Sequence, residues 1–264
     1  ADGAVAARRD GIEEAYALMD LSGSAAPGSY LWSVTATIDG VDFPQADPPR
    51  AITILPPRTE APMPLVRDAL DGALRPSEGN VLVSEGLAGT ADRQGKAGGA
   101  VRIEGGASKA VYAAPGLRAD AYSAALWFSP DDMSGRGPHH LLSCWAVSMD
   151  DPLRITISGM ELWAGIETAG GGVRTPGVRV EPGRWRHVAA VKEGTELRLY
   201  LDGDLRHTVQ VPAVWDTRAE AIGLGCNPNF GEREGFRGAL DDFVFEQRAW
   251  SDAEVLRMAG RDRP

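Results

Sequence analysis

A long series of short apolar segments separated by turns constrains the fold more than any other feature of the chain. It begins near Leu65 and continues almost to the end, and its segments are rich in β-branched and aromatic residues. Turn residues are plentiful, with 32 Gly and 18 Pro. Helical stretches do not alternate with these segments, which disfavours a parallel α/β fold. The pattern predicts an all-β protein in which antiparallel strands form a two-sheet sandwich.

We expect strands over residues 81–83, 100–103, 110–112, 121–128, 140–147, 153–157, 160–166, 185–191, 197–201, 205–211, 221–226 and 238–245. Successive side chains of a strand point to opposite faces. In the 121–128 segment, Tyr122, Ala124 and Leu126 should therefore share one face, and the residues between them the other.

Two hairpins and a closing helix have local signals. Gly194 and the Asp202-Gly203 pair separate apolar segments, and Gly accepts the positive φ that tight turns need. Ser251 and Glu254 have the spacing of a capping box. The sequence therefore predicts a short helix over residues 252–258 that stops at Gly260.

Residues 1–64 have a different character and form a separate N-terminal extension from the sandwich at 65–264. We expect one helix at 8–20, strands at 30–38 and 52–55, and a stiff Pro-rich linker before Leu65. One helix and two strands are too few for an independent core. Either this extension packs on the sandwich, or it completes a domain that begins upstream.

Several motifs after Leu65 resemble the laminin-G-like jelly rolls of the concanavalin A type. Trp185-Arg-His187-Val-Ala, followed by Leu197, Leu199-Tyr200 and Asp202-Gly203, resembles their central strand and hairpin. Further matches, in the family's order, are Asp92-Arg93, Gly99-Ala100, Ile103-Glu-Gly105, Ser123 to Trp127, Gly238 to Phe245, Arg248-Ala249 and Ser251 to Glu254. The resemblance implies an antiparallel jelly roll that serves as a binding or adhesion module outside the cytoplasm.

The signature residues themselves suit structural roles. Trp127 and Trp185 are large apolar plates that we expect between the two sheets. His187 has no Cys, Asp or second His at metal-ligand spacing, so we interpret it as a hydrogen-bonded structural histidine rather than a metal ligand or base.

Charge excludes several partners. The net charge is -10, and no run of Lys or Arg exceeds two residues. Nucleic acids and anionic membranes need concentrated positive charge, so both are poor partners. No apolar stretch approaches the length of a membrane span, which argues against membrane insertion. No signal peptide is recognisable, but its absence does not establish a cytoplasmic location. In line with the resemblance, we expect an extracytoplasmic location: secreted, periplasmic or on the cell surface.

The two cysteines, Cys144 and Cys226, lie far apart in the sequence and do not form a zinc motif. One disulfide between neighbouring strands and two buried free thiols both remain open.

Catalytic patterns are weak. Sandwich glycosidases need two carboxylates on one face of a strand, flanking the bond to be cleaved. Glu232 and Glu234 have that spacing but lie in a Gly-bounded loop, and Asp150-Asp151 and Asp241-Asp242 are adjacent pairs that split across faces. We therefore expect no enzyme, and keep a polysaccharide hydrolase or lyase as an alternative.

Binding candidates follow from aromatic and amide residues. A glycan surface needs exposed aromatic rings with polar groups nearby. The aromatic candidates are Trp145, Trp163, Trp215 and Phe230, with Asn227 and Asn229 as polar neighbours. The loop at 227–235 is the best candidate, because it is polar, bounded by Gly and contains Phe230. Most Trp residues in such a fold belong to the core.

The resemblance also implies one calcium ion, held near an aspartate of the last strand. Asp241 occupies that position; the alternative is a structural role, in which Asp241 caps a sheet edge or accepts backbone hydrogen bonds. The leading hypothesis is thus a noncatalytic module that binds a glycan or an extracellular protein. A structural subunit that docks into a larger assembly through residues 1–64 is the second.

Overall fold

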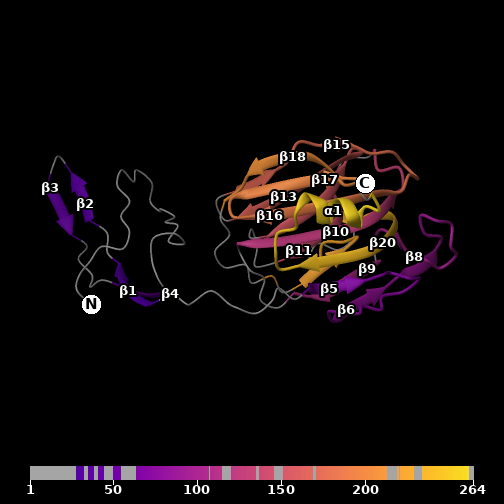
Figure 1. Cartoon of the computed structure of the whole chain (residues 1–264), viewed down its shortest axis with the longest axis horizontal. Helices are drawn as coiled ribbons and strands as arrows, with labels where there is room; N and C mark the ends of the chain where they lie inside the picture. Colours follow the sequence, from indigo (N-terminus) through magenta and orange to yellow (C-terminus); the bar gives the residue numbers. More distant parts are fainter. Residues whose placement is uncertain are drawn as a thin grey trace. The chain divides into compact units, whose positions relative to one another are not determined.

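Two antiparallel sheets stack face to face after Pro64 (Figure 1). The computed structural model describes residues 28–32, 35–38, 41–44, 50–54, 64–106, 108–114, 120–134, 137–145, 151–168, 171–212, 219, 221–228 and 234–261. The chain divides into two compact units, Ala1–Ala61 and Pro62–Pro264.

The first sheet, here the β10 sheet, has the order β18-β17-β16-β10-β20-β8-β7, with β5 also paired to β20. Its strands are β5 (Pro64–Asp68), β7 (Leu87–Thr90), β8 (Ala100–Glu104), β10 (Ala121–Pro130), β16 (Arg186–Glu193), β17 (Glu196–Leu201), β18 (Asp204–Gln210) and β20 (Arg237–Glu246).

The second sheet, here the β12 sheet, has the order β14-β13-β12-β11-β19-β9-β6, with β15 also paired to β13. Its strands are β6 (Val81–Glu85), β9 (Lys109–Ala113), β11 (His139–Trp145), β12 (Leu153–Ser158), β13 (Glu161–Thr168), β14 (Gly171–Arg174), β15 (Val178–Arg179) and β19 (Ala221–Leu224). The predicted all-β sandwich is confirmed.

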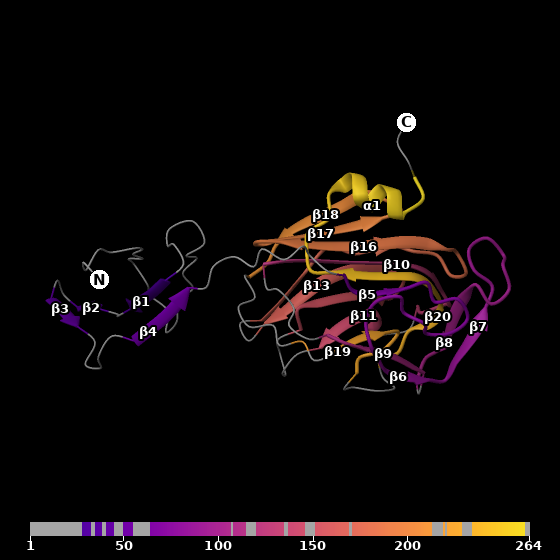
Figure 2. The same cartoon turned by 60° about the horizontal axis from the view of Figure 1, so that its bottom comes forward.

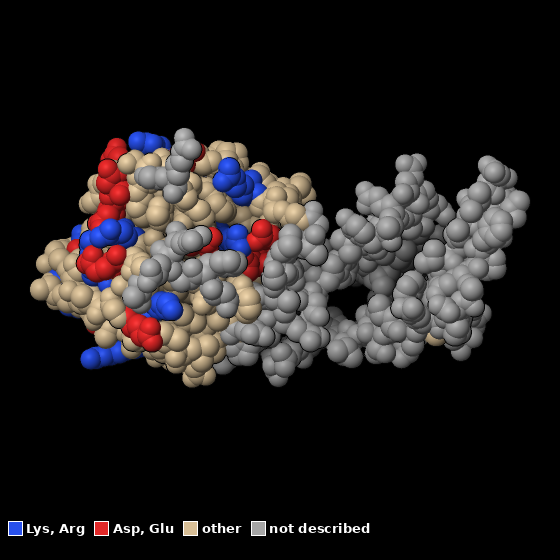
Figure 3. Space-filling view, turned by 180° about the vertical axis from the view of Figure 1, so that it is seen from behind, with Lys and Arg blue, Asp and Glu red and all other residues tan. Residues whose placement is uncertain are grey.

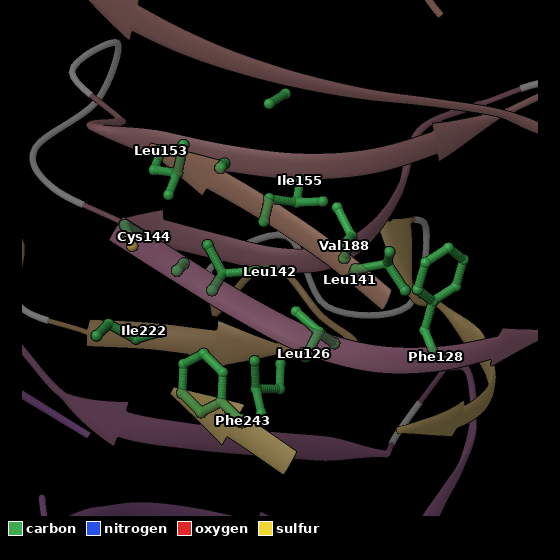
Figure 4. Close-up of a cluster of buried hydrophobic side chains, with 14 of the residues drawn as sticks. Leu126, Phe128, Leu141, Leu142, Cys144, Leu153, Ile155, Val188, Ile222 and Phe243 are labelled. Atoms are coloured by element: carbon green, nitrogen blue, oxygen red, sulfur yellow. The ribbon is translucent and has the colours of Figure 1, made fainter. Parts of the chain in front are cut away.

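The core lies between the sheets, where alternate residues of both meet. In β10, Tyr122, Ala124 and Leu126 belong to it, as the sequence pattern predicts. Across from them, Leu153 and Ile155 project inward from β12. Figure 4 shows Leu126, Leu153 and Ile155 interleaved with side chains of other strands in one apolar layer.

A second apolar cluster on the outside of the β10 sheet holds the closing helix. Helix α1 (Asp252–Met258) has the predicted capping box, and Gly260 follows it with φ +66°. The helix lies on the outer face of this sheet (Figure 2). There its Val255 packs with Trp250 and Tyr200. A Cβ at Gly203, in the predicted Asp202-Gly203 turn, would come within 2.9 Å of Leu256, so this turn needs Gly for space as well as for its φ of +82°.

Two predictions about tryptophans are wrong. Trp127 and Trp185 are half-buried and stand outside the central core. Alternation along β10 explains Trp127, because it shares a face with Ala125, which faces away from the second sheet. The interior is filled instead by Tyr112, Tyr122, Phe128, Phe243 and Phe245.

The disulfide alternative is also wrong, since Cys144 and Cys226 are buried free thiols. Cys144 lies opposite Ile222 of the neighbouring strand, and Cys226 follows the end of that strand. Burial raises the pKa of Cys226 to about 11, so its thiol is protonated at neutral pH.

The N-terminal unit contains two small antiparallel pairs. Strand β1 (Gly28–Trp32) pairs with β4 (Arg50–Ile54), and β2 (Thr35–Ile38) pairs with β3 (Val41–Pro44). The single strand predicted over 30–38 is thus two strands, because its halves pair with different partners. The predicted helix at 8–20 and most of the Pro-rich linker lie outside the described residues.

Truncation in the central core tests this packing. Replacing Phe243, which is fully buried, by Ala should lower the free energy of unfolding by about 3–5 kcal/mol through lost burial and the cavity that remains. Leu205→Ala is the control, since Leu205 is 47% exposed and should change stability by about 0.5 kcal/mol or less. Urea denaturation followed by tryptophan fluorescence measures both, and equal effects would contradict the assigned core.

Candidate functional site

The outer face of the β12 sheet receives the side chains that the core does not use. In β12, Ile155 and Ile157 point inward, so Thr156 and Ser158 point outward. In β13, Leu162 and Ala164 point inward, and the intervening Trp163 is outward and half-buried. The outer face of this sheet therefore carries an aromatic ring on β13, one strand in from the edge.

Three outward residues form a row across this face. His140 of β11 lies opposite Thr156, and Thr156 lies opposite Trp163. Neighbouring strands are about 4.8 Å apart, so the row covers roughly 10 Å from His140 to Trp163. His140 and Thr156 are fully buried, so Trp163 is the member of this row that solvent reaches.

A missing side chain makes room for the Trp163 ring. Gly165 is the next outward position of β13, and a Cβ there would come within 3.1 Å of the Trp163 ring and 3.1 Å of Arg174 Cβ. Arg174 of β14 lies directly opposite Gly165, and its Cζ lies 5.2 Å from the centroid of the Trp163 ring. This distance is within the range of a cation–π contact.

The ring borders a hollow of about 210 Å³. The residues that line it are Ser158, Glu161, Trp163, Arg174, Thr175, Pro176 and Gly177. Thr175 fixes the far wall, because its Oγ1 accepts from Ala164 N at 3.1 Å and its own N donates to Ala164 O at 2.8 Å. A polar hollow beside an aromatic face can hold a molecule with an apolar ring face and polar edges.

The loop at 227–235 is tied to the same row through Glu234. Glu234 Oε2 accepts from His140 Nε2 at 3.0 Å and from Asn227 Nδ2 at 2.9 Å. With a proton on Nε2, His140 Nδ1 accepts from the Thr156 hydroxyl at 2.8 Å. The His140 hydrogen bond lowers the pKa of Glu234, whose carboxylate is therefore ionised at neutral pH. We call these four residues the Glu234 latch.

The predicted binding residues fall in different places. Asn227 is 1% exposed and anchors the loop through Glu234, and Trp145 is half-buried at the end of β11. Their contact with a ligand stays a prediction. Trp215, Asn229 and Phe230 lie outside the described residues, as does Glu232. Asn227 and Glu234, two described residues of the predicted loop, lie at the His140 end of the row, and the Trp163 hollow lies at its other end.

Arg174, Glu161 and Thr175 are missed by sequence reasoning. A signal exists for Trp163, because it is polar-edged and stands between the inward residues Leu162 and Ala164. Arg174 becomes its neighbour only through the hairpin register that sets Thr168 opposite Gly171. An equally plausible turn one residue away would move Arg174 to the other face.

On the other sheet, Asp241 belongs to a compact ionic group. Arg93 pairs with Asp241 and, at 2.8 Å, with Asp242. The same guanidinium lies 4.7 Å from the Trp127 ring centroid. Burial raises the pKa of Asp241 to about 6, Asp242 acts in the same direction, and Arg93 opposes both. Within the described residues no three His, Cys, Asp or Glu side chains are grouped as a metal site, and calcium at Asp241 stays a prediction.

His187 is structural but not held as expected. Its ring lies edge-on to Trp127 with centroids 5.3 Å apart, and its Nδ1 has no hydrogen-bond partner among the described residues. Burial lowers the pKa of His187 to about 4, so it is neutral at neutral pH. Ring packing, rather than a hydrogen bond from Nδ1, holds it.

Comparison with known families assigns this sandwich to a superfamily. Residues 104–256 match the family model described as the concanavalin A-like lectin/glucanases superfamily. The chain belongs to this superfamily. A search of curated proteins finds no match. None of the helices in the described part of the chain has the length and apolar character that a bilayer crossing requires.

Two solved structures illustrate the similarity in fold. The binding domain of Paraclostridial Mosquitocidal Protein 1 is 13% identical, with a TM-score of 0.60 over 74% of this chain and 51% of that one. The botulinum neurotoxin serotype D ligand binding domain in complex with N-acetylneuraminic acid is 11% identical, with a TM-score of 0.59 over 74% and 50%. At these identities the likeness shows the fold alone, and this chain spans about half of each domain.

The Glu234 latch can be tested through pH. Glu234→Gln keeps the shape but removes the charge, and should lower the free energy of unfolding at pH 7 by about 1–3 kcal/mol. A carboxylate with a lowered folded pKa stabilises above its unfolded pKa, here 4.5, and loses that contribution as pH falls through the folded value. The difference between variant and wild type should thus shrink below pH 4.5. Glu85→Gln, at an exposed position of β6, is the control; a difference that persists unchanged in acid would contradict the latch.

The calcium prediction at Asp241 has a separate test. Arg93→Gln leaves Asp241 and Asp242 without their shared cation, and we expect a lower melting temperature because like charges then face each other. If Asp241 binds calcium, millimolar calcium chloride should restore part of this loss, and the restoration should vanish when Asp241→Asn is added. A melting temperature of Arg93→Gln that calcium leaves unchanged would count against the ion.

Proposed function

We propose that the sandwich is a noncatalytic glycan-binding module that acts outside the cytoplasm, and that its ligand lies on the outer face of the β12 sheet. One observation carries this proposal: Trp163 presents its ring beside a polar hollow, over a Gly that leaves space for it. Sugar rings have an apolar face that stacks on an aromatic ring, and hydroxyls that seek charged and amide partners.

The location on this face is supported by what covers the other. Helix α1 packs on the outside of the β10 sheet through Val255, beside Trp250 and Tyr200. On the side away from α1, acidic and basic side chains of the described residues are intermixed rather than gathered by sign (Figure 3). Such a surface favours hydrogen-bonded recognition of a polar ligand over attraction of one sign of charge.

The carboxylates of this face favour binding over catalysis. Along β13 the outward acids are Glu161 and Glu167, six residues or about 20 Å apart. Glycosidases place their two carboxylates within roughly 5–9.5 Å. Glu167 is held by Arg154 at 2.6 Å, and Glu234 is ionised within its latch, so it is unsuited to protonate a leaving group. The hydrolase or lyase alternative thus lacks a carboxylate pair on this strand.

Relatives in fold give further support. The botulinum neurotoxin serotype D ligand binding domain has been solved in complex with N-acetylneuraminic acid, and cell entry of botulinum neurotoxin type C depends on interaction with two ganglioside molecules. These ligands belong to whole domains of which this chain covers about half. A glycan ligand would also place the module in contact with a cell surface or secreted polysaccharide, consistent with an adhesion role.

Removal of the ring tests the proposal. Trp163→Ala should weaken binding to any glycan found on an array by at least about tenfold, because buried aromatic contacts commonly contribute about 2 kcal/mol or more. Trp185→Ala is the matched control, since Trp185 is also half-buried but precedes β16 of the other sheet. Calorimetric titration gives both affinities. Equal affinities of Trp163→Ala and wild type would overturn this location, and absence of any glycan ligand would overturn the function.

A further inference from the structure

Arg174 carries a charge that the fold does not neutralise. Its side chain is exposed, and within the described residues it makes no ion pair or side-chain hydrogen bond. Arg154, two strands away, differs: it pairs with Asp151 and, at 2.6 Å, with Glu167. Glu167, two residues beyond Gly165 on β13, is therefore already paired with Arg154. The Arg174 guanidinium contacts the Trp163 ring alone.

The fold fixes where this charge stands. Backbone pairing sets Arg174 opposite Gly165, and the Arg174 Cβ and the Trp163 ring both border the space that a Gly165 side chain would fill. The guanidinium and the ring therefore form two walls of one hollow. A guanidinium presents planar paired donors, which match the two oxygens of a carboxylate.

The other end of the hollow carries a negative charge, on Glu161. Glu161 is four residues before Gly165 on the same face, or about 13 Å along the strand. A Cβ at Gly177 would come within 2.6 Å of Glu161 Oε2, so a Gly there leaves space for this carboxylate. Arg179, its partner in register, donates instead to Gly159 O at 3.2 Å. Glu161 thus remains an acceptor for hydroxyl groups.

We propose that this hollow selects a sugar that carries a carboxylate, such as a sialic or uronic acid. The carboxylate binds Arg174, the apolar face of the ring stacks on Trp163, and hydroxyls at the far end donate to Glu161. This inference rests on the proposed glycan-binding function and adds the ligand class to it. The separation of the two charges gives the ligand a single orientation, because a reversed carboxylate would face Glu161.

Matched ligand pairs test the charge requirement on the whole chain. We would titrate sialyllactose against lactose, sialyllactose methyl ester against sialyllactose, and methyl glucuronide against methyl glucoside, each by calorimetry. We expect an acidic sugar to bind at least about tenfold more tightly than its uncharged counterpart, the effect of one charge-assisted contact. Arg174→Gln should abolish this preference, and Arg174→Lys should keep part of it.

The control is Arg184→Gln, an exposed arginine that pairs only with the surface residue Glu181 at 2.9 Å among the described residues. It should retain the full preference, and near-ultraviolet circular dichroism should show that every variant is folded. Equal wild-type affinity for acidic and uncharged sugars, or an undiminished preference in Arg174→Gln, would overturn the inference. If those sugars still require Trp163, the glycan function survives that result. Absence of binding to every sugar, acidic and neutral, would overturn both.

Discussion

The apolar layer between the two sheets determines everything that the outer faces can do. Strand alternation gives each core residue a neighbour that must point away, so the packing of Leu162 and Ala164 sends Trp163 outward. On the β10 sheet such outward residues are largely used by α1 and by the Arg93 group. On the β12 sheet His140 and Thr156 are buried in the Glu234 latch, whereas Trp163, Glu161 and Arg174 remain accessible. These three residues form the proposed recognition surface.

Glycines decide where large side chains can lie on those faces. Gly203 admits Leu256 and so lets α1 approach the sheet, while Gly165 admits the Trp163 ring beside Arg174. In both cases the absent Cβ is replaced by a neighbour within about 3.1 Å. A substitution by Ala would therefore displace a helix in one case and the proposed binding surface in the other, without altering the strand pairing itself.

Local signals in the sequence predicted the β-strands after Val81 well, together with the hairpin turns and the capped helix. They failed wherever strand register or pairing between distant segments determines which side chains meet. Trp127 faces outward because of its place in the alternation, and Arg93 meets Asp241 across 148 residues, which no local pattern reveals. Strand β5 begins at a proline and is completed only by β20. Arg174 lies beside Trp163 because of the register between β13 and β14, which cannot be read from either residue.

A protein with a net charge of -10 is an unexpected partner for an acidic sugar. The long-range effect of this net charge, however, differs from the short-range effect of a single charged contact. At physiological ionic strength charges beyond about 8 Å are largely screened, so most of the acidic surface acts weakly on a ligand in the hollow. A carboxylate on the Arg174 guanidinium would be at hydrogen-bond distance, and Arg154 already compensates Glu167 nearby. Local placement of one uncompensated cation therefore outweighs net charge. The overall charge would slow association with acidic ligands, while the Arg174 contact would set how long they stay.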